Sequence, residues 1–450
     1  MPRSIANHEL DALIAESGLS HAALARQVVH LGATEHGLRL AYDYRSIGRW
    51  LKGAVPDPPS PVLLAQVLSR ALGRALTVHQ LGFHHGDKIR QSLSISARPA
   101  ATVNAVTELW RSAVERRAFM HHSVTFIAAA AIEAALDWRD APAQTPLTRT
   151  EGARAATDAD IDRLRQATRE FRQLDHAHGG GYALSWLEQY LTTEVDPLLQ
   201  GSYSDSLGRE LFNVSATLTD MAGWMAMDAG HQGLAQYYYT QAAALAKHSG
   251  DTAYGAYVLG NLATQALVLG ETRTAVRLAR SARDTGGRAI PATLTARITV
   301  TEARAHALIG DSHETRHTLR VADRAMERSA PDQDPEWLGA FSPAHYCGSV
   351  MHALRDLGDT DAAEQQASAA LDLPARNART RALHGVLHAS VLIQRGDLDG
   401  AVEAASPIQQ DAAGIKSSRL NLRLAELAEQ FAPHRGVSVI ADYLEADRHR

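Results

Sequence analysis

Histidine is the residue type whose spacing in this chain comes nearest to a catalytic site. His384 and His388 lie four residues apart in a segment expected to be helical, which is the spacing of two zinc ligands on one helix face. A metalloprotease of that kind carries its catalytic glutamate directly after the first histidine, where this chain has Gly385. The pair is therefore predicted to be structural or to face solvent.

Two other segments carry residue types that could take part in chemistry. The glycine-rich HGGGY at 178–182 has no GxxxxGKS or GxxxxGKT pattern and no preceding strand alternation, so we expect a flexible break before a helix that begins near Ala183. Cys347 would need a positioned base to act as a nucleophile, and His345 lies only two residues away, which on a helix points elsewhere. The sequence thus predicts no enzyme, no metal site and no cofactor.

Basic side chains near the N-terminus offer binding chemistry instead. The chain of 450 residues has a formal charge of −5, yet residues 1–90 carry about +3 and leave about −8 elsewhere. In DYRSIGRWLKG (43–53), helical spacing puts Ile47, Trp50 and Leu51 on one face. The other face is polar and basic, with Tyr44, Arg45, Ser46, Arg49 and Lys52.

Several short helices are expected to position that basic face. A first helix over Ile5 to Ser17 places Leu10, Leu13 and Ile14 at helical spacing and stops at Gly18; Ser20 then caps a second helix in LSHAALARQV (19–28). A connection from Leu31 to Ala41, longer than a simple turn, precedes the third helix. Prolines 56, 58, 59 and 61 mark a rigid turn, VLLAQVLSRALG and LTVHQLGF supply closing helices, and residues 84–99 form a polar linker.

LSHAALARQV and RSIGRWLKGAVPDPPSPVLLAQVLSRALG resemble the helix-turn-helix core of Cro/repressor-like (XRE-type) regulators over about 80 residues. In that family the second helix of the motif enters the major groove of DNA. The resemblance makes Arg45, Ser46 and Arg49 the candidate base readers, and an arginine can donate two hydrogen bonds to guanine. His21, Tyr44 and Lys52 become candidate phosphate contacts.

The bulk properties fit a folded, mostly helical protein of the cytoplasm. The length exceeds what one hydrophobic core usually serves, and the hydrophobic and charged fractions are 45% and 21%, with only 6% aromatic residues. The one cysteine fits a reducing compartment. The most apolar run, Phe126 to Leu136, is too short to span a bilayer, so we expect no membrane segment.

A recurring turn indicates repeats in the rest of the chain. A glycine followed by a short polar run occurs at Gly230, Gly270, Gly310, Gly358 and Gly396, with separations of 40, 40, 48 and 38 residues. Small or apolar residues recur at fixed distances from these glycines: Gly223, Ala263, Ala303, Met351 and Ala389 before; Ala235, Ala275, Thr315, Ala363 and Ala401, then Ala242, Ala282, Ala322, Ala370 and Ile408 after. This spacing predicts a solenoid of helical hairpins.

The repeats resemble tetratricopeptide repeats with a longer period. The segments from Asp158 to Leu191 and from Gly208 to Asp251, and later PEWLGAFSPAHYCGSVMHALRDLGD, look like the sensory part of actinobacterial XRE-type regulators with tetratricopeptide-like C-termini. In related architectures the array dimerises or holds a peptide or small molecule in its groove. Counting back from each turn glycine places six candidate groove residues on or near the inner helices: Trp224, Tyr257, Asn261, Thr264, Arg297 and Arg304.

The sequence therefore predicts an all-α protein with a helix-turn-helix domain at 1–85, a linker at 86–100 and a tetratricopeptide-like solenoid at 101–450. The predicted function is a cytoplasmic, nucleoid-associated, sequence-specific transcriptional regulator. It would bind double-stranded operator DNA, form a homodimer and respond to a peptide, small-molecule or protein effector. The alternative is a repeat scaffold that regulates by sequestering a protein partner without binding DNA.

Overall fold

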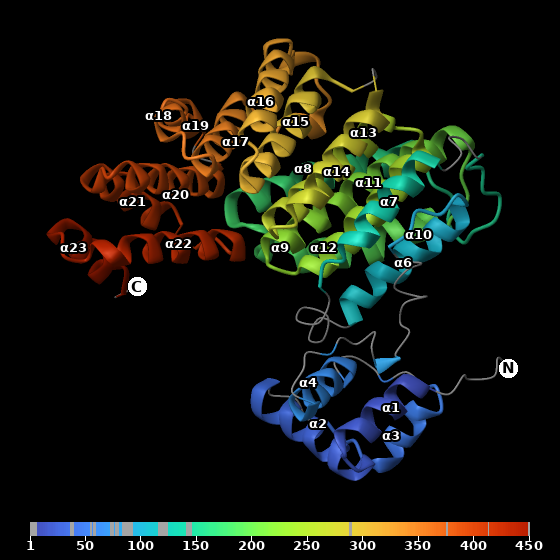
Figure 1. Ribbon diagram of the computed structural model, residues 1–450. Helices are drawn as coiled ribbons and strands as arrows, with labels where there is room; N and C mark the ends of the chain where they lie inside the picture. The colour runs from blue at the N-terminus through green and yellow to red at the C-terminus, as the bar shows by residue number, and fades with distance from the viewer. Residues whose placement is uncertain are drawn as a thin grey trace. The chain divides into compact units, whose positions relative to one another are not determined.

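The computed structural model describes residues 7–36, 40–54, 56, 60–72, 76, 81–82, 93–115, 125–140, 146–287, 290–374, 377–412 and 414–448 (Figure 1). These residues form helices and no strand; two isolated β-bridges join 149 to 203 and 155 to 202. The predicted all-α class is confirmed. The chain divides into an N-terminal unit, Met1–Gln91 with Glu115–Thr125, and a C-terminal unit, Ser92–Val114 with Phe126–Arg450.

The described residues of the N-terminal unit form the helices α1 His8–Ser17, α2 His21–His36, α3 Tyr44–Leu51 and α4 Ser60–Leu72. Gly18 ends α1 with φ +67°, as a left-handed C-terminal cap favours glycine. The Ser20 hydroxyl accepts a hydrogen bond from the Ala23 amide at 3.2 Å, so the predicted cap of the second helix is present. The predicted start of the first helix, at Ile5, lies outside the described residues.

The second helix is longer than predicted, so the prediction of a long connection from Leu31 to Ala41 is wrong. α2 continues to His36 because Leu31 falls three residues after Val28 and joins it in the core, at 4% exposed surface. A Cβ on Gly32 would lie 2.7 Å from Leu40 Cδ1, so glycine also permits close packing there. The connection to α3 is therefore confined to the residues after His36.

The core of the N-terminal unit joins all four helices. α4 matches the predicted closing segment VLLAQVLSRALG, and it buries Leu64 and Leu68 against Leu10, Leu24 and Ile47, all at 0% exposed surface. The described residues leave out most of LTVHQLGF, prolines 58 and 59, and the predicted linker as far as residue 92.

The C-terminal unit is an array of antiparallel helical hairpins. Its leading helices are α6 Pro99–Glu115, α7 Ala128–Asp140, α8 Asp158–His178, α9 Gly180–Tyr190 and α10 Asp196–Leu199. Five hairpins follow: α11 Asp205–Asp228 with α12 Gln232–Ser249; α13 Thr252–Val268 with α14 Thr272–Gly286; α15 Ala292–Ile309 with α16 Ser312–Glu327; α17 Pro343–Asp356 with α18 Thr360–Glu364 and α19 Ala367–Leu371; α20 Ala378–Arg395 with α21 Leu398–Asp411. α22 Ser418–Phe431 and α23 Ser438–Arg448 end the array (Figure 1).

The predicted turn glycines all occupy the same position, between the two helices of a hairpin. Each has a positive φ, from 75° to 91°, which glycine adopts without steric cost. Each glycine amide donates to the carbonyl three residues back, and the next amide donates to the carbonyl five residues back, as from Asp311 to His306. The common turn confirms that the glycine spacing marked a structural repeat.

The small residues flanking each turn lie between packed helices, as predicted. Five positions after each glycine, Ala235, Ala275, Thr315, Ala363 and Ala401 all have 0% exposed surface. Small side chains let helix backbones approach closely, so these positions fix the packing within each hairpin.

The longer interval of 48 residues contains an insertion. Between α16 and α17 the chain forms two short 3-10 turns, Pro331–Gln333 and Glu336–Leu338, in place of a direct connection. This insertion carries Trp337 to the inner helices.

The last helices of the array return to the first. Lys416, just before α22, donates its amide to the His178 carbonyl at 2.8 Å, and its carbonyl accepts from the Gly181 amide at 3.0 Å. A Cβ on Gly179 would lie 2.6 Å from the Lys416 oxygen, and one on Gly180 would lie 2.5 Å from the Met225 oxygen. The predicted break before the next helix is present, since Gly179 separates α8 from α9. However, α9 begins at Gly180 and not near Ala183, and the glycines here allow backbones to pack closely.

Candidate functional site

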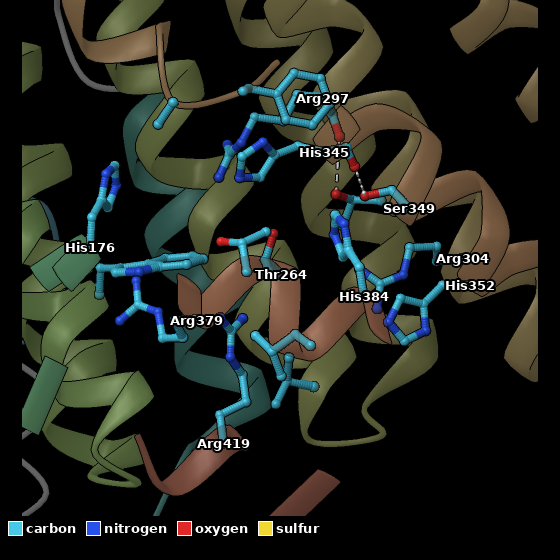
Figure 2. A pocket seen from close by; sticks show the side chains of 18 of the residues that line it. His176, Thr264, Arg297, Arg304, His345, Ser349, His352, Arg379, His384 and Arg419 are labelled. Atoms are coloured by element: carbon cyan, nitrogen blue, oxygen red, sulfur yellow. Dashed lines mark hydrogen bonds between the residues drawn. The ribbon is translucent and has the colours of Figure 1, made fainter. Parts of the chain in front are cut away.

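Closure of the array forms a cavity of about 260 Å³ in the C-terminal unit. Its wall comes from the inner helices α8, α11, α13, α15, α17, α20 and α22 and from the insertion around Trp337. Seven arginines and four histidines line it, together with aromatic side chains and three carboxylates (Figure 2). The arginines are Arg172, Arg297, Arg304, Arg355, Arg379, Arg419 and Arg423.

The structure places five of the six predicted groove residues on this wall. Trp224, Tyr257, Thr264, Arg297 and Arg304 line the cavity. Asn261 is 1% exposed and lies behind it, with its amide donating to the Asp220 carboxylate at 2.7 Å. Its side-chain carbonyl accepts from Arg297, so Asn261 is not one of the residues that face a ligand in the cavity.

A buried carboxylate organises the wall between α11 and α13. Asp220 accepts hydrogen bonds from Asn261 and from the Tyr254 hydroxyl, and Arg297 lies close to the same network. Burial raises the pKa of Asp220 to about 6, although the Asn261 hydrogen bond and the Arg297 charge oppose that shift. This network holds Arg297 at the cavity wall.

Aromatic rings form one side of the cavity. The Tyr257 ring stacks on Tyr254 with centroids 5.6 Å apart, and both meet the Trp337 ring, at 5.0 and 5.2 Å. The Arg297 guanidinium lies 4.4 Å from the Tyr257 centroid, a distance suited to a cation–π contact. This side can receive a flat or apolar group.

A second cluster of charges joins the first helices of the array to the last. Arg379 on α20 donates to both carboxylate oxygens of Asp175 on α8, at 2.9 and 2.7 Å, and to Asp228 on α11 at 2.9 Å. Asp228 also accepts from the Ser417 hydroxyl at 2.8 Å and the Gly180 amide at 2.9 Å. Despite the opposing effect of burial, the Arg379 charge keeps the pKa of Asp228 below its usual value.

Arg304 lies at another part of the wall and differs from Arg379. Within the part of the chain that the structure describes, its guanidinium has no carboxylate within ion-pair distance, although the Asp356 charge opposes the effect of burial on its pKa. Its Nε is buried without a hydrogen-bond partner, a feature that Arg379 shares, whereas the terminal nitrogens of Arg379 pair with two aspartates. Burial lowers the pKa of Arg304 to about 10. The pKa values of His352 and His384 are lowered as well, by burial first and then by the nearby Arg304 charge, so these imidazoles are neutral at pH 7.

The histidine pair and the cysteine have ordinary structural partners. His384 bonds through Nδ1 to the Ala370 carbonyl at 2.7 Å, whereas His388 Nε2 lies 3.0 Å from Glu364. Cys347 is partly buried, and burial raises the pKa of its thiol. No group of three or more potential metal ligands occurs among the described residues.

In the N-terminal unit, α3 presents the predicted basic face. Tyr44 is 55% exposed, and Arg45, Arg49 and Lys52 are also exposed. Positions 45, 49 and 52 follow each other at helical spacing, so the three cations share one side of the helix. His21, at the start of α2, is half-buried.

Ser46 is buried and does not lie on the exposed face of this helix, where a base reader was predicted. Its side chain is 3% exposed and bonds to Asp43, whose carboxylate accepts from the Ser46 amide at 3.0 Å and from its hydroxyl at 3.2 Å. This is a capping box that fixes the start of α3. Burial in the cap counts against Ser46 as a base reader.

The sequence prediction missed the residues that the far ends of the array contribute. Arg379, Arg419 and Arg423 come from α20 and α22, and Trp337 from the insertion. One signal was present for Trp337, because the interval of 48 residues breaks the period of about 40. No local sequence pattern indicates that α20 and α22 contact α8 and α11.

Comparison with known protein families finds a match in the N-terminal unit. Residues 10–84 match a family described as the SP15 N-terminal domain. The matched range contains most of α1 and all of α2 to α4, and it stops before the helical array. No curated protein and no solved structure matches the chain. Among the residues described by the structure, no helix is both long and apolar enough to cross a membrane.

Proposed function

We propose that this protein is a DNA-binding transcriptional regulator whose helical array holds an effector in its cavity. The observation that carries the proposal is the exposed row of Tyr44, Arg45, Arg49 and Lys52 on α3. A helix of this size fits the major groove, and arginine is the commonest reader of guanine. The Asp43–Ser46 cap and the buried Ile47 and Trp50 support this helix from behind.

In this proposal the protein acts in the cytoplasm, on the nucleoid, as a homodimer that reads two half-sites. One N-terminal unit carries few positive charges, and affinity for DNA depends strongly on the number of phosphates neutralised. Pairing two units would double that number. A monomer in sedimentation that still bound one isolated half-site tightly would contradict the dimer.

The test is genome-wide capture of DNA by the purified full chain, at a stated salt concentration because salt alone changes affinity. The variant Arg45→Ala/Arg49→Ala removes the two proposed readers. The control Arg273→Ala/Arg277→Ala removes two exposed arginines from α14 and changes the net charge equally.

We expect the wild type and the control to enrich sites that share a sequence motif, and the α3 variant to lose them. Absence of enrichment by the wild type, with and without cell extract to supply an effector, would reject DNA binding. That result would favour the repeat scaffold that sequesters a protein partner.

A further inference from the structure

We propose that the cavity binds a small organic anion, with Arg304 pairing its carboxylate or phosphate group and the Tyr257–Trp337 side receiving its apolar part. As the identity of an effector, this inference rests on the proposed function. As a binding site, it rests on the geometry of the C-terminal unit alone.

The cavity wall carries an excess of positive charge. Seven arginines face three lining carboxylates, Asp175, Asp220 and Glu426, so cations outnumber anions. Counting also Asp228 and Asp356, which bond to lining arginines from behind, leaves a positive excess. The lining histidines with resolved pKa shifts, His345, His352 and His384, all have lowered values, with arginine charges among the causes.

Arg304 differs from most other arginines of the wall in its lack of an acceptor. Most lining arginines have an acceptor: Arg379 has two aspartates, Arg355 has Asp356, and Arg423 has Glu426. In the described part of the chain Arg304 has no carboxylate at ion-pair distance, and the Asp356 charge acts on it only from farther away. An unpaired buried charge costs stability unless something compensates it. An anion in the cavity would supply that compensation with a charge-assisted hydrogen bond.

Arg304 and the aromatic side of the cavity lie some distance apart. Figure 2 shows Arg304 and His352 at the same end of the cavity, with His384 beside them, whereas Arg297 lies at another side. Arg297 and Arg304 are seven residues apart on α15, which corresponds to roughly 10 Å along a helix. A ligand that reaches from Arg304 to the Tyr257 and Trp337 rings must therefore combine an anionic group with an apolar body.

The size of the cavity selects the class of ligand. Its volume of about 260 Å³ lies below the roughly 300–1,000 Å³ of pockets for drug-sized ligands. A compact ligand fills a volume of this size. The wall thus favours a compact aromatic or aliphatic acid, or a phosphate ester of similar size.

Isothermal titration calorimetry on the full chain tests this inference, in a cationic buffer that does not compete. The probes are phenylphosphate, phenylacetate, inorganic phosphate, the cation benzylamine and the neutral benzyl alcohol. We expect saturable binding of at least one aromatic anion, weaker binding of inorganic phosphate, and none of benzylamine or benzyl alcohol. Which aromatic anion binds more tightly distinguishes a phosphate from a carboxylate ligand.

Arg304→Met should weaken the binding of the anion at least tenfold, since one charge-assisted pair contributes about 1.5–3 kcal/mol. Arg277→Met, which removes an exposed arginine from α14, should bind like the wild type. Arg304→Lys keeps the charge but loses the planar fork, so we expect an intermediate affinity for the anion. This second variant tests the site if the methionine variant unfolds. Unchanged binding by these Arg304 variants, equal binding of benzylamine, or no binding of either aromatic anion would overturn the inference.

This titration contains no DNA, so its outcome is separate from that of the DNA capture. Anion binding without captured DNA would leave the cavity assignment intact and reject the regulator. Captured DNA without anion binding would reject only the ligand class.

Discussion

The arginines of α3 and those of the cavity share a side chain and differ in their surroundings. Arg45 and Arg49 are exposed on a short helix, where water and salt screen their charges. Arg304, Arg379 and Arg419 are enclosed by several helices, where an unpaired charge is expensive and a paired one is held rigidly. The exposed set suits a large polyanion such as DNA, and the enclosed set suits either a structural carboxylate or a small anion.

The largest expected effect separates the two kinds of enclosed arginine. Arg379→Met would leave Asp175 and Asp228, at 5% and 0% exposed side-chain surface, without their main cation. Breaking a buried pair from one side costs about 3–5 kcal/mol. We expect urea unfolding of the full chain to show that loss.

Arg304→Met is the matched control from the same cavity. Because Arg304 has no carboxylate partner, its replacement should leave the free energy of unfolding unchanged or raise it. Equal losses in both variants would contradict the distinction between a structural and a ligand-binding arginine.

A smaller effect is expected where glycines close the array. Gly180→Ala would place a Cβ 2.5 Å from the Met225 oxygen and should destabilise the C-terminal unit by about 1–3 kcal/mol. Gly48, within α3, has no atom within 4 Å of its would-be Cβ, so Gly48→Ala should stabilise that helix by about 0.5–1 kcal/mol. Thermal unfolding of the two variants checks the opposite signs, and a loss in both would show that α3 is also tightly packed.

The pH dependence of stability should reflect a buried histidine outside the cavity. His248 on α12 lies 3.0 Å from the Thr102 hydroxyl of α6, and burial lowers its pKa to about 4. Because the folded pKa lies below the usual 6.5, His248 favours folding above pH 6.5, and this contribution is lost as the pH falls toward 4.

At pH 5 the contribution of His248 to the free energy of unfolding is lower by about 2 kcal/mol, because each pKa unit corresponds to about 1.4 kcal/mol. His248→Gln should therefore reduce the difference in unfolding free energy between pH 7.5 and pH 5. The exposed His8→Gln serves as the control and should keep the wild-type difference. Identical pH profiles for all three proteins would argue against a neutral, buried His248.

The smallest effect concerns the cap of α3. Asp43→Ala removes the acceptor for the Ser46 amide and hydroxyl and should cost about 1 kcal/mol. Hydrogen exchange of the α3 amides measures the expected fraying. Unaltered exchange would mean that packing of Ile47 and Trp50 alone holds this helix.

Local chemistry explains which features the sequence predicted. The turn glycines and the small residues around them were predictable because each hairpin repeats the same left-handed cap and the same close approach. Counting back from those glycines also located Trp224, Tyr257 and Arg304 on the inner helices. These inferences needed only the period of the repeat.

Contacts between distant segments explain the errors. The glycines at 179–181 pack against Lys416, more than 200 residues away, and no local pattern distinguishes such a contact from a flexible break. Arg379 was missed for the same reason. Ser46 was assigned by position in a family pattern, whereas its burial depends on the Asp43 carboxylate three residues before it.

The proposal that α3 reads DNA is tested by the binding of a captured DNA site. Fluorescence anisotropy measures this binding over a series of salt concentrations. For the wild type we predict tight binding that weakens steeply with salt, as expected when several phosphates are neutralised. Arg45→Ala/Arg49→Ala should lower the affinity by roughly 2–6 kcal/mol in total, at about 1–3 kcal/mol per arginine. The α14 control should bind like the wild type. Equal affinity of the α3 variant and the control would contradict the proposal that α3 reads DNA.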